Sequence, residues 1–140
     1  MKYELACEFS ILVDPTAKAR PRFTKQGRAY TPKTTKDYEK LVSDTLRYAF
    51  KSCVIECRPL IMELEFHIER PKSVTRPYPT VKPDIDNFAK AILDAANGIL
   101  YKDDALICDL HIKKRYADTG YVRLKLSYLD CVMEGQEITI

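Results

Sequence analysis

The chain has 140 residues, of which 46% are apolar and 31% are charged, and its formal net charge is +3. This length and composition suit one folded domain and argue against a disordered or low-complexity chain. No apolar run approaches the roughly 20 residues that cross a bilayer, and the charged N-terminus lacks the apolar stretch of a secretory signal, so we expect a cytoplasmic protein without membrane contact.

The cysteine pattern does not predict a metal site. There are five cysteines and two histidines, and no Cys-x-x-Cys pair occurs. Cys53 and Cys57 could be read as ligands at a spacing of four, but reduced thiols in the cytoplasm are the commoner case. We therefore expect no zinc and assign the cysteines no chemistry.

The first elements in chain order are a strand, a basic segment and a helix. Residues 3–13 alternate between apolar and polar, which predicts a half-buried strand. Prolines interrupt residues 14–32 and predict an extended basic loop or a short hairpin. Over residues 34–50 the apolar positions recur at intervals of three and four, which predicts a helix with Thr34 or Thr35 as its N-cap.

The second half of the chain predicts three more strands and one more helix. The helix follows a proline-rich basic loop, with Asp86 as its N-cap and with Asn97 and Gly98 at its end. Each strand shows apolar alternation, and a turn at residues 118–120 joins the last two. The expected strands are residues 60–69, 106–116 and 121–129.

The resulting element order is β-α-β-α-β-β. We expect a single α+β domain with a sheet of about four strands and both helices packed on one face. We assign residues 1–129 to this domain. Residues 130–140 show little pattern and are assigned to a C-terminal tail.

Positive charge is concentrated in two segments. Residues 15–36 carry seven cations and no acid, with Phe23 and Tyr30 between them, and residues 70–83 are also basic and free of acids. Such a segment is either a solvated loop or a phosphate-binding element. The candidate DNA-binding cations are Lys18, Arg20, Arg22, Lys25, Arg28, Arg76 and Lys82.

Negative charge is concentrated in a third segment, residues 84–109, which holds six aspartates and no glutamate. Pro83 favours an extended backbone before the helix, so the side chains of Asp84 and Asp86 can point the same way. Asp104 lies in the loop after the helix, and the spacing alone does not bring it near the other two. Three carboxylates without cysteine or histidine suit Mg²⁺ or Mn²⁺ rather than Zn²⁺.

A metal ion held by these carboxylates can bind a scissile phosphate and activate a water, so the expected reaction is phosphodiester hydrolysis. Lys90, one helical turn after Asp86, could reach the phosphate or the water. The alternative is purely structural, with Asp86 as a helix cap, Lys90 and Asp94 as a surface pair, and the later aspartates as turn residues. Asp84 counts against this alternative, because a cap does not need a like charge beside it.

Several motifs resemble a known family. Residues 82–90 read Lys-Pro-Asp-Ile-Asp-Asn-Phe-Ala-Lys, residues 94–98 read Asp-Ala-Ala-Asn-Gly and residues 101–105 read Tyr-Lys-Asp-Asp-Ala. Their order and spacing resemble the RusA-type Holliday junction resolvases. Lys-Ala-Arg-Pro-Arg-Phe at residues 18–23 and Tyr-Thr-Pro-Lys at residues 30–33 resemble the N-terminal part of phage and prophage members.

The resemblance runs from residue 18 to residue 128 and implies a homodimer that binds four-way DNA junctions. Each subunit would supply one site, and the dimer would nick two strands symmetrically with Mg²⁺ or Mn²⁺ in DNA recombination and repair. The resemblance implies that Asp84, Asp86 and Asp104 are the catalytic, metal-binding aspartates. It also places Lys90 on the functionally important lysine of the family.

Two other functions stay open at this point. One is a metal-dependent nuclease for flaps or other branched DNA. The other is a non-catalytic nucleic-acid-binding module in which the aspartates are structural. The aspartates count against the module, because a binder gains nothing from anions near phosphate.

Overall fold

The computed structural model describes residues 3–19, 21–30 and 32–129. Four long strands form one sheet, and two short strands form a separate hairpin. The predicted tail lies outside the described residues. In chain order the elements are β1 (Glu4–Ile11), β2 (Arg22–Phe23), β3 (Ala29–Tyr30), α1 (Lys33–Ala49), β4 (Leu60–Glu69), α2 (Ile85–Ala96), the 3-10 helix η1 (Asp104–Leu106), β5 (Ile107–Ala117) and β6 (Tyr121–Tyr128).

The large sheet has the strand order β1-β6-β4-β5. β6 pairs antiparallel with β1 and β4, whereas β4 and β5 are parallel. A parallel pair requires a crossover, and α2 provides it. Because α2 runs back along the sheet, it begins near the end at which β4 finishes and ends near the end at which β5 starts.

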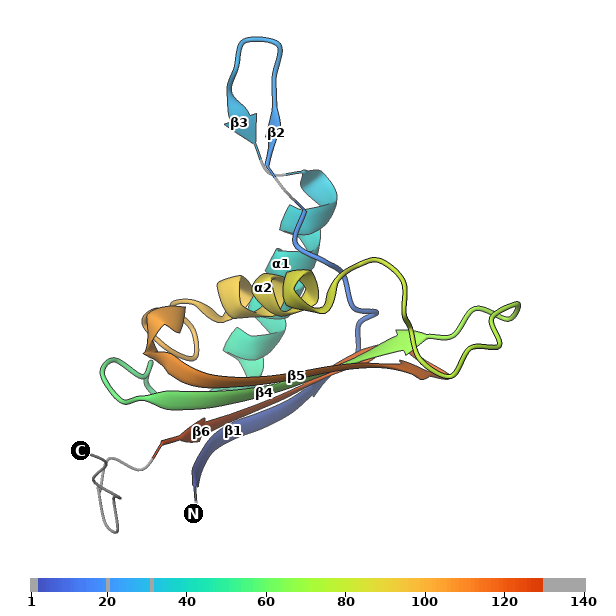
Figure 1. Cartoon of the computed structure of the whole chain (residues 1–140). Helices are drawn as coiled ribbons and strands as arrows, with labels where there is room; N and C mark the ends of the chain where they lie inside the picture. Colours follow the sequence, from blue (N-terminus) through green and yellow to red (C-terminus); the bar gives the residue numbers. More distant parts are fainter. Residues whose placement is uncertain (1–2, 20, 31, 130–140) are drawn as a thin grey trace, which may run out of the picture.

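The sheet has one covered and one open face. Figure 1 shows α1 and α2 on the same side of the sheet, and the buried apolar side chains of the strands join the core on that side. The predicted α+β fold, with both helices on one face, is confirmed. Among the described helices, none has the length and apolar character needed to span a membrane.

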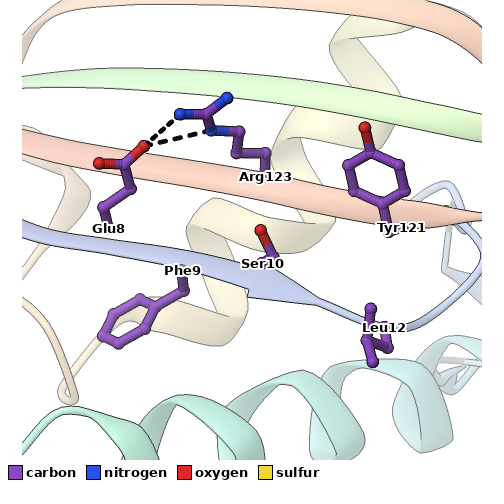
Figure 2. Close-up of a pocket in the computed structure, with 6 residues that line it drawn as sticks. All are labelled: Glu8, Phe9, Ser10, Leu12, Tyr121 and Arg123. Atoms are coloured by element: carbon purple, nitrogen blue, oxygen red, sulfur yellow. Dashed lines mark hydrogen bonds and ion pairs between the residues drawn. The ribbon is translucent and has the colours of Figure 1, made fainter.

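The open face is polar. In Figure 2, Phe9 of β1 points toward the helices, while the neighbouring Glu8 points the other way and meets Arg123 of β6. The Arg123 guanidinium donates two hydrogen bonds to one carboxylate oxygen of Glu8 and lowers the pKa of that carboxyl. Glu8 and Arg123 line a shallow hollow on this face together with Phe9, Ser10, Leu12 and Tyr121. Because the two charges pair with each other, we assign the hollow no chemistry.

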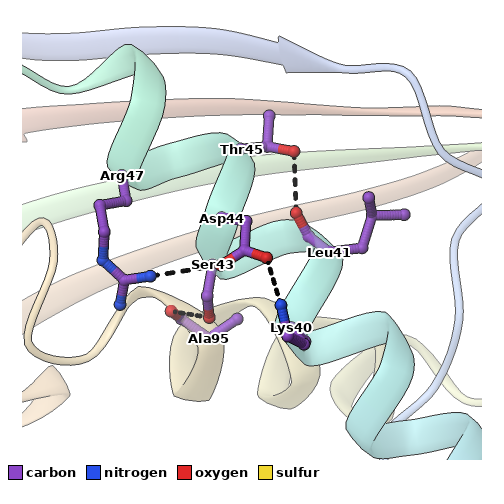
Figure 3. Close-up of polar contacts among 7 residues, drawn as sticks. All are labelled: Lys40, Leu41, Ser43, Asp44, Thr45, Arg47 and Ala95. Atoms are coloured by element: carbon purple, nitrogen blue, oxygen red, sulfur yellow. Dashed lines mark hydrogen bonds and ion pairs between the residues drawn. The ribbon is translucent and has the colours of Figure 1, made fainter.

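Apolar stripes hold the two helices against the sheet and against each other. The fully buried residues in these stripes include Val42 and Leu46 of α1 and Phe88, Ala91 and Ile92 of α2. Ser43 Oγ donates a hydrogen bond of 2.8 Å to the Ala95 carbonyl, which joins α1 to α2 (Figure 3). On the solvent side of α1, Asp44 pairs with Lys40 and Arg47. Such exposed pairs contribute little to stability.

Both predicted N-caps are wrong. Pro32 is the N-cap of α1, so neither Thr34 nor Thr35 holds that position, and Thr35 is buried in the first turn. Proline suits a helix start because its fixed φ is compatible with helical geometry and the start needs no N–H donor. At α2, Asp84 is the N-cap with an extended backbone, φ −70° and ψ 150°, and Asp86 lies in the first turn.

Other predicted boundaries agree better with the structure. α2 ends at the predicted place, with Asn97 as its C-cap and Gly98 at a φ of +78°. That φ lies in the left-handed region that glycine adopts without strain. The basic segment forms the short hairpin that was one of its two predicted forms. β4 has its predicted limits, and the limits of the other three long strands differ from the predicted ones by at most two residues.

Candidate active site

Asp84 and Asp86 lie at the N-terminal end of α2, and both are exposed. The Oδ2 atom of Asp84 is 3.1 Å from the Nζ atom of Lys82. The positive end of the helix dipole favours carboxylates here and offsets part of their mutual repulsion. This end of the helix therefore presents two carboxylates to solvent.

A shallow groove borders Asp84. Its lining residues are Thr80, Val81, Lys82, Asp84 and Lys114. Lys114 belongs to β5, and its Nζ donates hydrogen bonds of 3.0 Å to the carbonyls of Val81 and Pro83. The loop before α2 is thus fixed to the sheet, and this contact positions Asp84.

Asp103 and Asp104 lie beyond the C-terminal end of α2. Asp103 caps η1, and the Asp104 N–H donates a hydrogen bond of 2.9 Å to Oδ1 of Asn97, the C-cap of α2. Partial burial, a hydrogen bond to Asp103 and the negative charges of Asp103 and Asp94 raise the pKa of Asp104, while Lys90 opposes this shift. A cation beside Asp104 would favour the ionised carboxylate and lower the pKa instead of raising it.

Lys90 is exposed in the middle of α2, one turn from Asp86 on one side and from Asp94 on the other. Within the described part of the chain Lys90 forms no ion pair, so the alternative surface pair with Asp94 is absent. Asp94 instead lies 3.3 Å from the Lys18 Nζ, which also pairs with Glu39. Burial lowers the pKa of Lys18, but these two carboxylates outweigh burial and raise it overall.

The three predicted metal ligands do not come together in one chain. Asp86 and Asp94, which neighbours Asp104, are eight positions apart in α2, which is about 12 Å along the helix axis. Mg²⁺ binds oxygen at about 2.0–2.1 Å, so Asp86 and Asp104 of one chain cannot hold the same ion in this arrangement. Throughout residues 3–19, 21–30 and 32–129, no three acidic, histidine or cysteine side chains are placed to share a metal.

The predicted DNA-binding cations differ in what they contact. Lys18 is held by carboxylates, Arg76 Nε donates a hydrogen bond of 2.9 Å to the Tyr116 hydroxyl, and Lys82 pairs with the N-cap of α2. Arg20 lies outside the described residues. Within this predicted set, the cations whose side chains have no ion pair or hydrogen bond among the described residues are Arg22, Lys25 and Arg28.

The stretch that contains all these residues matches a known family. Residues 13–127 match the family described as Endodeoxyribonuclease RusA. The chain belongs to the RusA endodeoxyribonuclease family. The resemblance to RusA-type Holliday junction resolvases is thereby confirmed, and the activity of the family is cleavage within DNA strands. The matched region contains every predicted site residue, from Lys18 to Asp104.

The RusA-family chain is also similar to a curated bacterial protein. This is the "Uncharacterized protein YqaN" of Bacillus subtilis (strain 168), which is 28% identical over 134 residues. The aligned region covers 85% of this chain and 94% of that protein. The similarity therefore covers most of both proteins, and the name of the relative says nothing about activity.

The network around Lys18 was not predicted from the sequence. Glu39 of α1 and Asp94 of α2 bind the Lys18 ammonium, and the Lys18 N–H donates a hydrogen bond of 2.9 Å to the Asn87 carbonyl. In this RusA-family chain these contacts fasten the basic segment to the helix that carries the candidate site. The sequence did contain one indication of this network. Asp94 comes about two helical turns after Asp86, so the two side chains lie on nearly the same face of the helix. Nothing in the spacing indicated which cation would meet it.

Proposed function

We propose that the chain is a Mg²⁺- or Mn²⁺-dependent Holliday junction resolvase that acts in the cytoplasm in DNA recombination and repair. It acts as a homodimer and nicks two strands symmetrically. The observation that supports this most directly is that one helix of a RusA-family chain carries candidate catalytic groups along its whole length. Asp84 and Asp86 lie at its start, Lys90 at its middle and Asp104 just beyond its end.

The incomplete arrangement in one chain supports the proposed homodimer. The carboxylates lie at opposite ends of α2, because α2 is the crossover between the parallel strands β4 and β5. A two-fold axis that sets two α2 helices antiparallel would place Asp104 of one copy beside Asp84 and Asp86 of the other. Such a dimer has two equivalent sites, which suits two symmetric nicks.

The side chains of each chain have separate roles in this proposal. The three aspartates hold the metal, whose chemistry is to bind the scissile phosphate and activate a water. Lys90 is exposed and has no ion pair among the described residues, so it is available to bind a phosphate oxygen. The cations of the hairpin bind phosphates away from the cut, which orients the DNA but does not read its sequence.

Cleavage of defined DNA substrates tests the proposal. A synthetic four-way junction, a flap and a linear duplex are incubated with Mg²⁺, Mn²⁺ or EDTA, and the cut positions are mapped for the wild type and for Asp86→Asn. The matched control is Asp109→Asn on β5, where Asp109 pairs with His111 at 3.0 Å. We expect paired nicks in the junction with metal, loss of cutting in Asp86→Asn and full activity in the control.

The other outcomes select other functions. Preferential cutting of the flap would keep the metal site and replace the substrate. Binding without cutting under every metal condition would identify a nucleic-acid-binding module and contradict catalysis.

Mixing two inactive variants tests whether the site is shared between copies. A heterodimer of Asp86→Asn and Asp104→Asn contains one site with both aspartates intact if the ligands come from different chains. We therefore expect the mixture to recover nicking of one strand without paired cuts. If both ligands came from the same chain, the mixture would be as inactive as each variant alone.

A further inference from the structure

The hairpin of β2 and β3 has a turn of defined shape. The Thr24 N–H donates to the Arg28 carbonyl at 2.8 Å, the Gly27 N–H to the Thr24 carbonyl at 2.9 Å, and the Arg28 N–H to Thr24 Oγ1 at 3.1 Å. Gly27 has a φ of +82°, a conformation that other residues rarely adopt. In Figure 1 this hairpin stands away from the sheet and the two large helices.

The pairing register places two aromatic rings on opposite faces of the hairpin. Arg22 lies opposite Tyr30, and Phe23 lies opposite Ala29. Neighbouring side chains in a strand point to opposite faces, so Phe23 and Tyr30 do not share a face. Phe23 is 70% exposed and Tyr30 is 44% exposed.

Phe23 differs from the other phenylalanines and from the most exposed tyrosines. The other four phenylalanines are buried or half-buried. Tyr48 and Tyr78 are also exposed, but Tyr48 contacts the Lys51 ammonium and Tyr78 contacts the Arg115 guanidinium. Phe23 makes no ring contact with any residue that the structure describes, so its ring is available to an external partner.

The cations beside Phe23 are available as well. Among the described arginines, Arg22 and Arg28 are the two whose guanidinium groups have no carboxylate, carbonyl, hydroxyl or ring as a partner. The arginines that do have such a partner are Arg47, Arg58, Arg70, Arg76, Arg115 and Arg123. Lys25 in the turn also has no ion pair within the part of the chain that the structure describes. The hairpin thus combines an exposed aromatic ring with three available cations and no acid.

We propose that Phe23 stacks on a nucleobase exposed at the branch point of a DNA junction, while Arg22, Lys25 and Arg28 bind the phosphates beside it. This inference rests on the proposed function and assigns the recognition of branched structure to a single ring. An aromatic side chain can stack on the face of any base, whereas bases within a linear duplex already stack on each other. Phosphate binding alone would require the cations and leave the exposed ring without a role.

A binding experiment tests this role without cleavage. The full chain carrying Asp86→Asn is the parent, EDTA is present, and the probe is a four-way junction with 2-aminopurine next to the crossover. A linear duplex of the same sequence is the second probe. We expect Phe23→Ala to weaken junction binding about 5- to 100-fold and to remove the fluorescence change, with duplex affinity preserved within about twofold.

Two variants control this experiment. Phe23→Trp keeps a stacking ring and should retain both junction affinity and the fluorescence change. Tyr48 lies on α1, away from the hairpin, and is 80% exposed. Tyr48→Ala therefore removes an exposed ring and should change neither the junction affinity nor the fluorescence signal. Thermal unfolding of each variant should match that of the parent, because Phe23 lies outside the core.

The possible failures are distinguishable. Equal junction affinity and fluorescence in the parent and in Phe23→Ala would overturn the stacking role and leave the nuclease proposal intact. An equal loss on junction and duplex would also overturn it, because the ring would then be a general DNA contact. A parent that binds the junction no better than the duplex would overturn both the proposed substrate and this inference.

Discussion

The two basic segments, residues 15–36 and residues 70–83, are both rich in cations and free of acids, yet their cations have different contacts in the structure. In the later segment, Arg70 lies over the Tyr116 ring at 4.4 Å, and Arg76 donates a hydrogen bond to the Tyr116 hydroxyl. In the earlier segment, the hairpin cations Arg22, Lys25 and Arg28 have no such partners among residues 3–19, 21–30 and 32–129.

The difference lies in what surrounds each segment. Residues 70–83 run beside β5, and Tyr116 of that strand supplies both a ring face and a hydroxyl to the arginines. The hairpin projects beyond the helices (Figure 1). Among the described residues, the side chains of Arg22, Lys25 and Arg28 have no ion pair, hydrogen bond or ring contact. The number of cations in a segment therefore does not measure how many can bind phosphate.

The largest effect is expected from removal of the hairpin charges. For the triple variant Arg22→Gln, Lys25→Gln, Arg28→Gln we measure the slope of the logarithm of the DNA association constant against the logarithm of the salt concentration. This salt slope should become less negative by about 2.7, or about 0.9 for each lost phosphate contact on duplex DNA. The free energy of unfolding should not change, because these side chains have no partners in the described structure. Fluorescence anisotropy at several salt concentrations measures the slope, and an unchanged slope would contradict the role of the hairpin.

The next effect is expected for Lys18→Met, which leaves Glu39 and Asp94 without their shared cation. We expect a loss of about 1–2 kcal/mol in the free energy of unfolding, measured by urea denaturation. Lys40→Met is the matched control, because Lys40 pairs with Asp44 on the exposed side of α1, and it should cost less than about 0.5 kcal/mol. Equal losses in the two variants would show that the Lys18 network is an ordinary surface pair.

The pH dependence of the Lys18 effect follows from the direction of its pKa shift. Folding raises the pKa of Lys18 above its ordinary value of 10.5. Its contribution to stability is therefore full below that ordinary value and is lost as the pH rises through the higher folded value. The difference between wild type and Lys18→Met should stay constant from neutral pH to about pH 9.5 and shrink in more alkaline solution.

A smaller effect is expected for Arg76→Ala. The variant loses an exposed hydrogen bond to the Tyr116 hydroxyl and the contact of the guanidinium with the Tyr116 ring, whose centroid lies 5.9 Å away. These losses should lower the free energy of unfolding by up to about 1 kcal/mol. Tyr116→Phe removes the hydroxyl and keeps the ring, so it should cost less. The salt slope for DNA binding should change by less than about 0.5, and a change near 0.9 would identify Arg76 as a phosphate contact after all.

The smallest effect is expected for Lys82→Gln. The Lys82 side chain is 86% exposed and pairs with Asp84, which is itself 52% exposed, so solvent screens the pair. Stability should change by less than about 0.5 kcal/mol. A salt slope that changes as much as it does for Lys25→Gln would show that Lys82 leaves Asp84 to bind phosphate.

The local structure was predictable from the sequence to a large extent. Alternation placed the strand at residues 60–69 where β4 lies, and Gly98 marked the end of α2. The starts of the two helices were not predicted correctly. In α2 the first apolar residue of the periodic pattern lies inside the helix, and in α1 the N-cap Pro32 precedes both threonines. At α2 both candidate caps are aspartates two positions apart, so the capping preference for this residue type does not separate them.

The long-range part of the site was less predictable. The motifs indicated which aspartates matter, but the distance between Asp86 and Asp104 depends on the parallel pairing of β4 with β5, which no local pattern specifies. The partners of Lys18 likewise come from two different helices. Contacts between distant segments depend on the packing of the whole domain, which neither spacing nor charge describes.

The attachment of Lys18 to α2 has a consequence for where the enzyme would cut. The residue binds Glu39 and Asp94 and donates its N–H to the Asn87 carbonyl, so Lys18, four residues before β2, is fixed to the helix that carries the aspartates. A DNA arm gripped by the hairpin would then lie at a set offset from the candidate site. In a nuclease built this way, the distance between the hairpin and the aspartates determines the number of nucleotides between the branch point and the nick.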